Sequence, residues 1–135
     1  MKLPAITAIA AALLTAACGG GPGDPWLADV TYAAGAAQGG ATLLRAHSTV
    51  GPDCAVGAAP QIEIISQGKL GVARVAPATD VIVAPEQDCD GDEVAATGVF
   101  YDANAGAAGI DSVVYRALRG GALPDRTYAA NIRVR

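Results

Sequence analysis

The last nine residues of the chain alternate between two kinds of side chain, and this alternation is the strongest single constraint on the fold. The apolar set is Tyr128, Ala130, Ile132 and Val134, and the set between them is Thr127, Ala129, Asn131, Arg133 and Arg135. A period of two residues is that of a strand with one buried and one solvated face. The segment therefore predicts a strand in a half-exposed sheet.

Six shorter runs of aliphatic, β-branched or aromatic residues precede this segment, and turn-forming residues separate them. The runs lie at residues 43–50, 62–65, 71–75, 81–83, 99–101 and 113–115, with turns expected at 67–68, 90–91, 104–109 and 120–121. Pro77 is expected to end the third run and Pro85 the fourth. Many short strands with close turns predict an all-β fold, a sandwich or a barrel.

The N-terminus has the parts of an export signal. Lys2 supplies a positive charge, residues 3–14 are apolar or small, and residues 15–17 are small enough for a signal peptidase. An uncharged run of about twelve residues is too short to span a bilayer core, which takes ~20 helical residues. The segment is therefore expected to be a signal peptide.

The stretch 14–18, which ends at Cys18, resembles the cleavage site of a bacterial lipoprotein. Lipoproteins usually carry Leu three positions before the cysteine, whereas here Thr15 stands there and Leu14 one place earlier. The resemblance implies a lipid on Cys18, and Gly19 after it resembles sorting to the outer membrane. Two alternatives stay open: an ordinary secretory signal cut near Ala17, and a retained N-terminal helix.

Three segments are expected along the chain: a lipoprotein signal peptide at 1–17, a flexible tether at 18–40 and a β-sandwich domain at 41–135. The tether is rich in Gly, Ala and Pro, a composition that packs no core. Within it, residues 32–37 are compatible with a weak helix or a strand. Trp26 is expected to dock the tether onto the domain, or to contact a membrane or a partner.

The chain has three cysteines, which is an odd number for an exported protein. If Cys18 carries the lipid, Cys54 and Cys89 remain, and an oxidising compartment would join them in a structural disulfide. A redox pair or a metal site is the alternative. No CxxC spacing exists and His47 is the only histidine, so the disulfide is favoured.

A resemblance to a known family lies in the second half of the chain. Tyr101 is followed by Gly109, Asp111 and Tyr115 at the offsets found in the late strands of bacterial Ig-like and cadherin-like domains. The turn at 67–71 also resembles that family's turn. The resemblance covers roughly residues 45–135, and it implies an Ig-like antiparallel β-sandwich with an adhesion or scaffold role.

The chain departs from that family where larger side chains are usual. Ala103 stands in place of a proline, Ala107 and Ala108 in place of an aromatic residue, and Val113 in place of phenylalanine. Each exchange removes apolar area that could be buried. The core is therefore expected to be thin, which makes the disulfide more important.

The acidic segment 88–93 is the strongest candidate for a metal site. Asp88, Asp90 and Asp92 resemble part of a calcium loop, but an EF-hand needs Gly at position six and Glu at position twelve. Counted from Asp88, Gly91 stands at position four and Val99 at position twelve, so the EF-hand pattern fails. A looser oxygen site with further acidic residues, such as Asp80 or Asp53, stays open. We expect instead a hairpin with the Asp-Gly pair at its tip.

Other function classes lack support in the sequence. The net charge of −4 gives no nucleic-acid footprint, and the arginines between 116 and 135 are expected to lie on a solvated strand face. With one histidine and no GxSxG or phosphate-binding loop, we expect no enzyme and no cofactor.

We therefore expect a lipid-anchored, non-enzymatic cell-envelope protein with one Ig-like structural or interaction domain. It would face the periplasm or the cell surface from the outer membrane, with the membrane and envelope proteins as its partners. The alternative is a small periplasmic binding or inhibitor-like lipoprotein. A pocket lined by Trp26 or His47 would favour that alternative, and a filled core would favour the first.

Overall fold

The structure is a computed structural model that describes residues 27–120 and 123–135, and these residues are built mainly of strands. The strands are β1 (Val30–Ala36), β2 (Ala41–His47), β3 (Gln61–Ser66), β4 (Gly71–Val81), β5 (Glu93–Ala103), β6 (Gly109–Leu118) and β7 (Arg126–Val134), and a 3₁₀ turn, η2 (Pro52–Cys54), lies between β2 and β3. The expectation of an all-β chain is confirmed. Within the two described ranges, no helix has the length and apolar character to cross a membrane.

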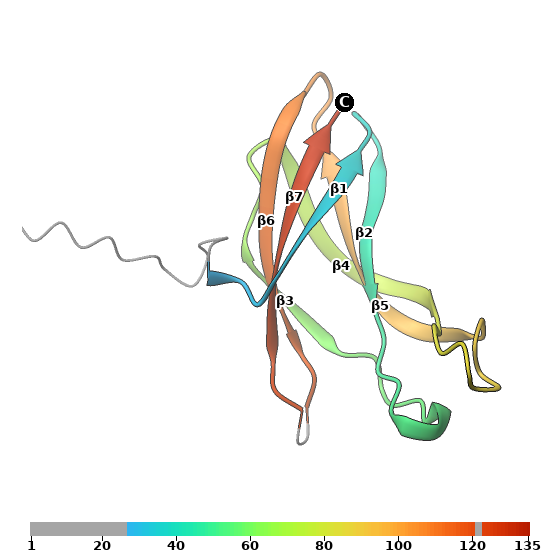
Figure 1. The fold of residues 1–135 in the computed structure, drawn as a ribbon. Coiled ribbons are helices and arrows are strands. Elements are labelled where there is room, and N and C mark those ends of the chain that lie inside the picture. The colour runs from blue at the N-terminus through green and yellow to red at the C-terminus, as the bar shows by residue number, and fades with distance from the viewer. Residues whose placement is uncertain (1–26, 121–122) are drawn as a thin grey trace, which may run out of the picture.

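Two sheets pack against each other as a sandwich (Figure 1). One sheet has the strand order β1-β7-β6-β3 and the other β2-β5-β4. Neighbouring strands are antiparallel except for β1 and β7, which are parallel. Side chains fill the space between the sheets, and the largest that are fully buried there are Tyr101, Tyr115, Ile132, Val99 and Val113.

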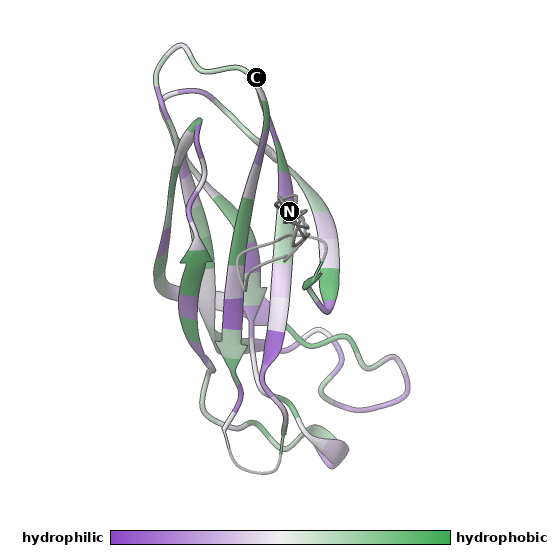
Figure 2. Cartoon of the chain, turned by 90° about the vertical axis from the view of Figure 1, so that its left-hand side faces the viewer, coloured by the Kyte–Doolittle hydropathy of each residue, from purple (hydrophilic) through white to green (hydrophobic). Residues whose placement is uncertain are grey.

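The alternation at the C-terminus predicts β7 correctly. Tyr128, Ala130, Ile132 and Val134 face the core and are buried. Asn131 and Arg133 are exposed on the other face. Figure 2, coloured by hydropathy, shows hydrophobic and hydrophilic residues following one another along the strands of this sheet.

The folded domain begins earlier than the predicted boundary at residue 41. Val30–Ala36 is a strand, so the prediction of a flexible tether at 18–40 is wrong for these residues. Of the helix and the strand that the sequence allowed at 32–37, the structure has the strand. The small residues of β1 have a weak intrinsic preference for the strand conformation, and pairing with a neighbouring strand provides the stabilisation that this preference does not. Every residue of β1 is in register with β7, and Tyr32 packs against the core.

Three smaller expectations are also wrong. β4 continues through Pro77 to Val81, because β4 is an edge strand, where a residue without an N–H is tolerated. The run at 81–83 is therefore the end of β4 and not a separate strand. Similarly, β2 ends at His47, and Val50 forms only an isolated bridge with Val56.

The buried carboxylate of Asp111 stabilises the end of the sandwich at which the turn between β3 and β4 lies. Asp111 accepts hydrogen bonds from the backbone N–H groups of Lys69, Leu70 and Ser112, each at 2.9 Å, and from the hydroxyl of Tyr101 at 2.5 Å. Burial alone would raise the pKa of Asp111, but these four donors outweigh it and hold the pKa below its usual value. The turn, β5 and β6 are thus tied to one side chain.

Two glycines make this close packing possible. A Cβ at Gly71 would lie 2.7 Å from the ring of Tyr101, and one at Gly68 would lie 3.0 Å from the carboxyl carbon of Asp111. Any other residue would push the turn away from the carboxylate. The spacing from Tyr101 to Asp111, noted in the sequence as a family resemblance, has this local physical role.

Candidate functional site

Most candidate functional residues gather at one end of the sandwich, which we name the loop end. It comprises the connections 48–60 and 82–92 and the described residues 119–120 and 123–125, and it lies at the opposite end of the molecule from the C-terminus (Figure 1). Strands β2, β4 and β6 end there, and β3, β5 and β7 begin there. Because loops carried by a rigid sandwich tolerate varied side chains, this end is the natural place for a site.

A small second core stabilises two of these loops. Ile82, Cys89 and Val94 are buried in it, and Val50, Cys54 and Ala84 pack around them. The structure bonds Cys54 to Cys89, which is the pairing that the cysteine count predicted. The bridge joins η2 to the loop 82–92, so two segments distant in sequence are fixed relative to each other.

The Asp90–Gly91 pair does not form the hairpin tip that the sequence predicted. The β4–β5 connection has eleven residues, 82–92, and Gly91 lies at its base, where its N–H donates to the carbonyl of Ile82. Gly91 has φ +86°, a conformation that favours glycine. The pair therefore closes a long loop, because residues 84–90 form additional turns of their own.

The acidic side chains of this loop are used separately. Asp90 accepts a hydrogen bond from the N–H of Ala84 at 2.8 Å, which caps the loop. Asp88 and Asp92 line an open hollow together with Asp53 and the disulfide. Among the residues that the structure describes, no three His, Cys, Asp or Glu side chains are grouped so that they could hold a metal ion.

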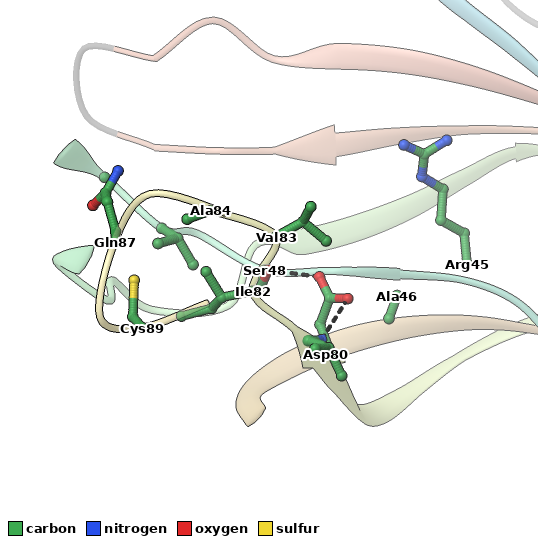
Figure 3. A pocket seen from close by; sticks show the side chains of 12 residues that line it. Arg45, Ala46, Ser48, Asp80, Ile82, Val83, Ala84, Gln87 and Cys89 are labelled. Atoms are coloured by element: carbon green, nitrogen blue, oxygen red, sulfur yellow. Dashed lines mark hydrogen bonds between the residues drawn. The ribbon is translucent and has the colours of Figure 1, made fainter. Parts of the chain in front are cut away.

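An open pocket of the loop end lies between the start of the 48–60 connection and the loop 82–92 (Figure 3). Its volume is about 640 Å³, and its wall includes Ser48, Asp80, Ile82 and Val83. The hydroxyl of Ser48 donates to Asp80 at 2.7 Å. This pair has no histidine to complete a Ser–His arrangement, because His47 points to the other side of β2, into the sandwich.

His47 is the centre of an aromatic cluster between the two sheets. Its Nε2 lies 2.8 Å from the hydroxyl of Tyr115, which is 3.0 Å from the hydroxyl of Tyr32. The imidazole also meets the ring of Tyr128 edge-on, at 4.7 Å between centroids. The guanidinium of Arg45 covers the rings of Tyr32 and Tyr128 at 5.2 and 5.4 Å. Three of the four tyrosines in the chain thus converge on its only histidine.

Burial sets the protonation state of this cluster. Burial and, to a smaller extent, the charge of Arg45 together lower the pKa of His47 to about 4, against an opposing effect of Asp80. Burial also raises the pKa of Tyr115, and a hydrogen bond with Tyr32 adds to that rise. At neutral pH the imidazole of His47 and the phenol of Tyr115 are therefore uncharged.

The lowered pKa of His47 predicts that acid destabilises the domain. The folded domain holds His47 in its neutral form, whereas in the unfolded chain the imidazole has a pKa of ~6.5. The stability gained from neutral His47 is therefore fully present above pH ~6.5. It is lost as the pH falls toward the folded-state pKa of about 4, because protons bind the unfolded chain first. We expect the melting temperature to decrease between pH 6.5 and 5, a range above the titration of Asp111, and to decrease less in His47→Gln. NMR titration of the single imidazole should give a midpoint near 4, and a midpoint near 6.5 would contradict the buried cluster.

The sequence predicted some of these residues as a site and missed others. Cys54 and Cys89 come together, whereas Asp88, Asp90 and Asp92 do not form one site. The cluster around His47 was missed, since Tyr32 lay in the presumed tether and a single histidine in a short strand carries no motif. The alternation of Arg45 and His47 with smaller residues is the only local signal for it. Cys18 and Trp26 lie outside the described residues.

No protein-family model matches this chain, and no curated protein or solved structure matches it with significance.

Proposed function

We propose that the protein is an exported, lipid-anchored and non-enzymatic envelope protein, whose single Ig-like domain acts by interacting with other envelope components. The observation that carries this proposal is the pairing of Cys54 with Cys89. This disulfide uses two of the three cysteines. The third, Cys18, ends a lipoprotein-like signal and remains available for lipid attachment. Structural disulfides of this kind are typical of oxidising compartments.

The geometry of the domain favours interaction over catalysis. Tyr101, Tyr115 and Ile132 fill the space between the described parts of the two sheets, where a substrate chamber would otherwise lie. Ser48 is hydrogen-bonded to Asp80, and His47 to Tyr115. The hydroxyl and the imidazole both border the small hollow of the loop end, but each is engaged by a different partner, which favours a structural or adhesive module.

A small binding lipoprotein is the second candidate function. Two pockets of the loop end favour it: the open pocket beside Ser48 and a much smaller one that His47 lines. A domain held near a membrane by a lipid could present either pocket to a ligand or a partner protein. The anchor is common to both candidates, so it is the first property to test.

We expect the protein to incorporate labelled palmitate when it is expressed in a bacterium, and the substitution Cys18→Ser to abolish the label. The thioether-linked lipid needs the sulfur of Cys18, and no other cysteine is available once Cys54 and Cys89 are paired. Gly20→Ser, two residues later in the tether, is the matched control and should keep the label. Label retained in Cys18→Ser, or absent from the unmodified protein, would contradict the anchor.

A further inference from the structure

A second, smaller hollow at the loop end is bordered by His47 and Tyr128 of the aromatic cluster, is partly open to solvent and has a volume of about 100 Å³. Its walls come from both sheets and from the connections beside them. The lining residues are His47, Ser48, Pro60, Ala117, Arg119, Arg126 and Tyr128. The hollow is distinct from the open pocket beside Asp80, although Ser48 borders both.

The register of the strands explains why two arginines meet there. Arg126, at the start of β7, stands opposite Ala117 of β6, and Arg119 is two positions beyond Ala117. Side chains two positions apart along a strand share a face, so Arg126 continues the face of Tyr128 along β7. Arg119 lies one residue beyond the end of β6, and both arginines border the hollow, Arg126 exposed and Arg119 half-buried. Ala117 is too small to fill the space between them, and His47 closes the hollow from the opposite sheet.

Two carboxylates lie near Arg126 along the backbone but do not line the hollow: Asp125 precedes Arg126, and Asp29 accepts a hydrogen bond from the N–H of Thr127. The lining itself carries positive charge. It includes no Asp or Glu. Within residues 27–120 and 123–135, the two ion pairs use Arg74 and Arg116, and neither Arg119 nor Arg126 is paired with a carboxylate. Two guanidinium groups facing one small space repel each other unless an anion lies between them.

The neighbouring polar groups are already engaged. Nε2 of His47 is hydrogen-bonded to Tyr115, which leaves Nδ1 as the other polar atom of the ring. The hydroxyl of Ser48 donates to Asp80, and the carboxylate of Asp80 also accepts from the N–H of Val81, so this acid is satisfied outside the hollow. Arg45 faces the same imidazole from the other side, over Tyr128.

We propose that this hollow is an oxyanion-binding site, in which Arg119 and Arg126 hold one carboxylate or phosphate group next to His47. The volume of about 100 Å³ is that of roughly three water molecules, far less than the ~300–1,000 Å³ of sites that enclose a whole ligand. The site therefore takes the anionic end of a larger molecule. Planar guanidinium groups suit both oxyanions, because each can donate two parallel hydrogen bonds.

Binding at this site is coupled to the proton on His47. The empty site keeps the imidazole neutral, because burial and Arg45 disfavour its charge and Asp80 only partly offsets them. An anion beside the ring favours the charged form, as an opposite charge at ~4–6 Å raises a histidine pKa by about one unit or more. By linkage, the anion binds more tightly as the pH falls from about 6 toward the pKa of about 4 of the empty site.

The test uses the protein as it is processed in the cell, with inorganic phosphate and acetate as probes and sodium chloride at equal ionic strength as the reference. His47 is the only histidine, so its imidazole signals in NMR report the site without ambiguity. We expect phosphate or acetate to raise the midpoint of the imidazole titration by about one pH unit, with saturation. A larger shift with phosphate assigns the site to phosphate esters, and a larger shift with acetate assigns it to carboxylates.

The variant Arg119→Gln/Arg126→Gln should lose this shift while keeping its melting temperature, because both arginines lie at the ends of their strands. Arg133→Gln/Arg135→Gln removes the same charge elsewhere on the chain, where neither residue lines the hollow, and should keep the shift. An equal response to chloride, or an undiminished shift in Arg119→Gln/Arg126→Gln, would overturn the proposal. Neither result depends on the lipid at Cys18, so the anchor and the site can fail separately.

Discussion

Replacement of Asp111 by alanine is expected to lower the free energy of unfolding by about 3–5 kcal/mol, because several buried donors lose their acceptor together. The carboxylate is 6% exposed and accepts from Lys69, Leu70, Ser112 and Tyr101. The alanine side chain offers no acceptor, and the packing of the turn gives water little access. Urea unfolding of the variant and of the wild type measures the difference.

Two variants separate this lock from ordinary surface effects. Asp102→Ala removes an exposed carboxylate that pairs with Arg74, and we expect a loss below ~1 kcal/mol. Tyr101→Phe removes one of the four donors and leaves the others bonded, so its effect should be about 1–2 kcal/mol. If Asp111→Ala were no more harmful than Asp102→Ala, the carboxylate would not hold this end of the fold.

Removal of the disulfide is expected to have the second-largest effect. In Cys54→Ser/Cys89→Ser the unfolded chain regains the entropy of a loop with a sequence separation of 35 residues. The chain-entropy account gives about 3–4 kcal/mol for such a loop, and we expect a measured loss of about 2–4 kcal/mol. The comparison is between the oxidised wild type and the double variant in urea.

The loss should also be local in character. The bridge joins η2 to the loop 82–92 over the small core of Ile82 and Val94. Hydrogen exchange should therefore accelerate most at the loop end, whereas β6 and β7 keep their protection. Two reactive thiols in the denatured, unreduced wild-type domain, or equal stability of both proteins, would show that the bridge is not part of the native protein.

The sequence predicted those parts of the fold in which a local pattern of side chains is enough to identify a strand or a buried residue. The alternation from Tyr128 to Val134 reflects one buried face, and β7 follows directly from it. The spacing from Tyr101 to Asp111 carried the resemblance to Ig-like domains, and the structure shows that these two side chains are hydrogen-bonded. In both cases the residues are large or charged enough to leave a pattern.

The misses have a common physical cause, which is that partners distant in sequence decide the outcome. β1 consists largely of small residues and becomes a strand because β7 is beside it. Pro77 stays inside β4 because that strand is at the edge of its sheet. Gly91 closes a loop of eleven residues through the carbonyl of Ile82, which no local turn signal reveals.

The same limit applies to the candidate site. Cysteine arithmetic paired Cys54 with Cys89, because only two cysteines remained once Cys18 was assigned. To predict the hollow beside His47, one would need to know that β6 and β7 pair with Arg126 opposite Ala117, and that His47 of the opposing sheet packs against them. Basic residues near the C-terminus were visible in the sequence, but which of them share a face and a cavity was not.

The most direct test of the proposed function is the intact mass of the N-terminal peptide of the protein, purified from bacterial membranes. We predict that this peptide begins at Cys18 and carries the mass of a diacylglycerol thioether, with or without a further acyl chain on the amino group. A peptide that begins at Met1, or one that begins at residue 18 with an unmodified thiol, would contradict the lipid-anchored account.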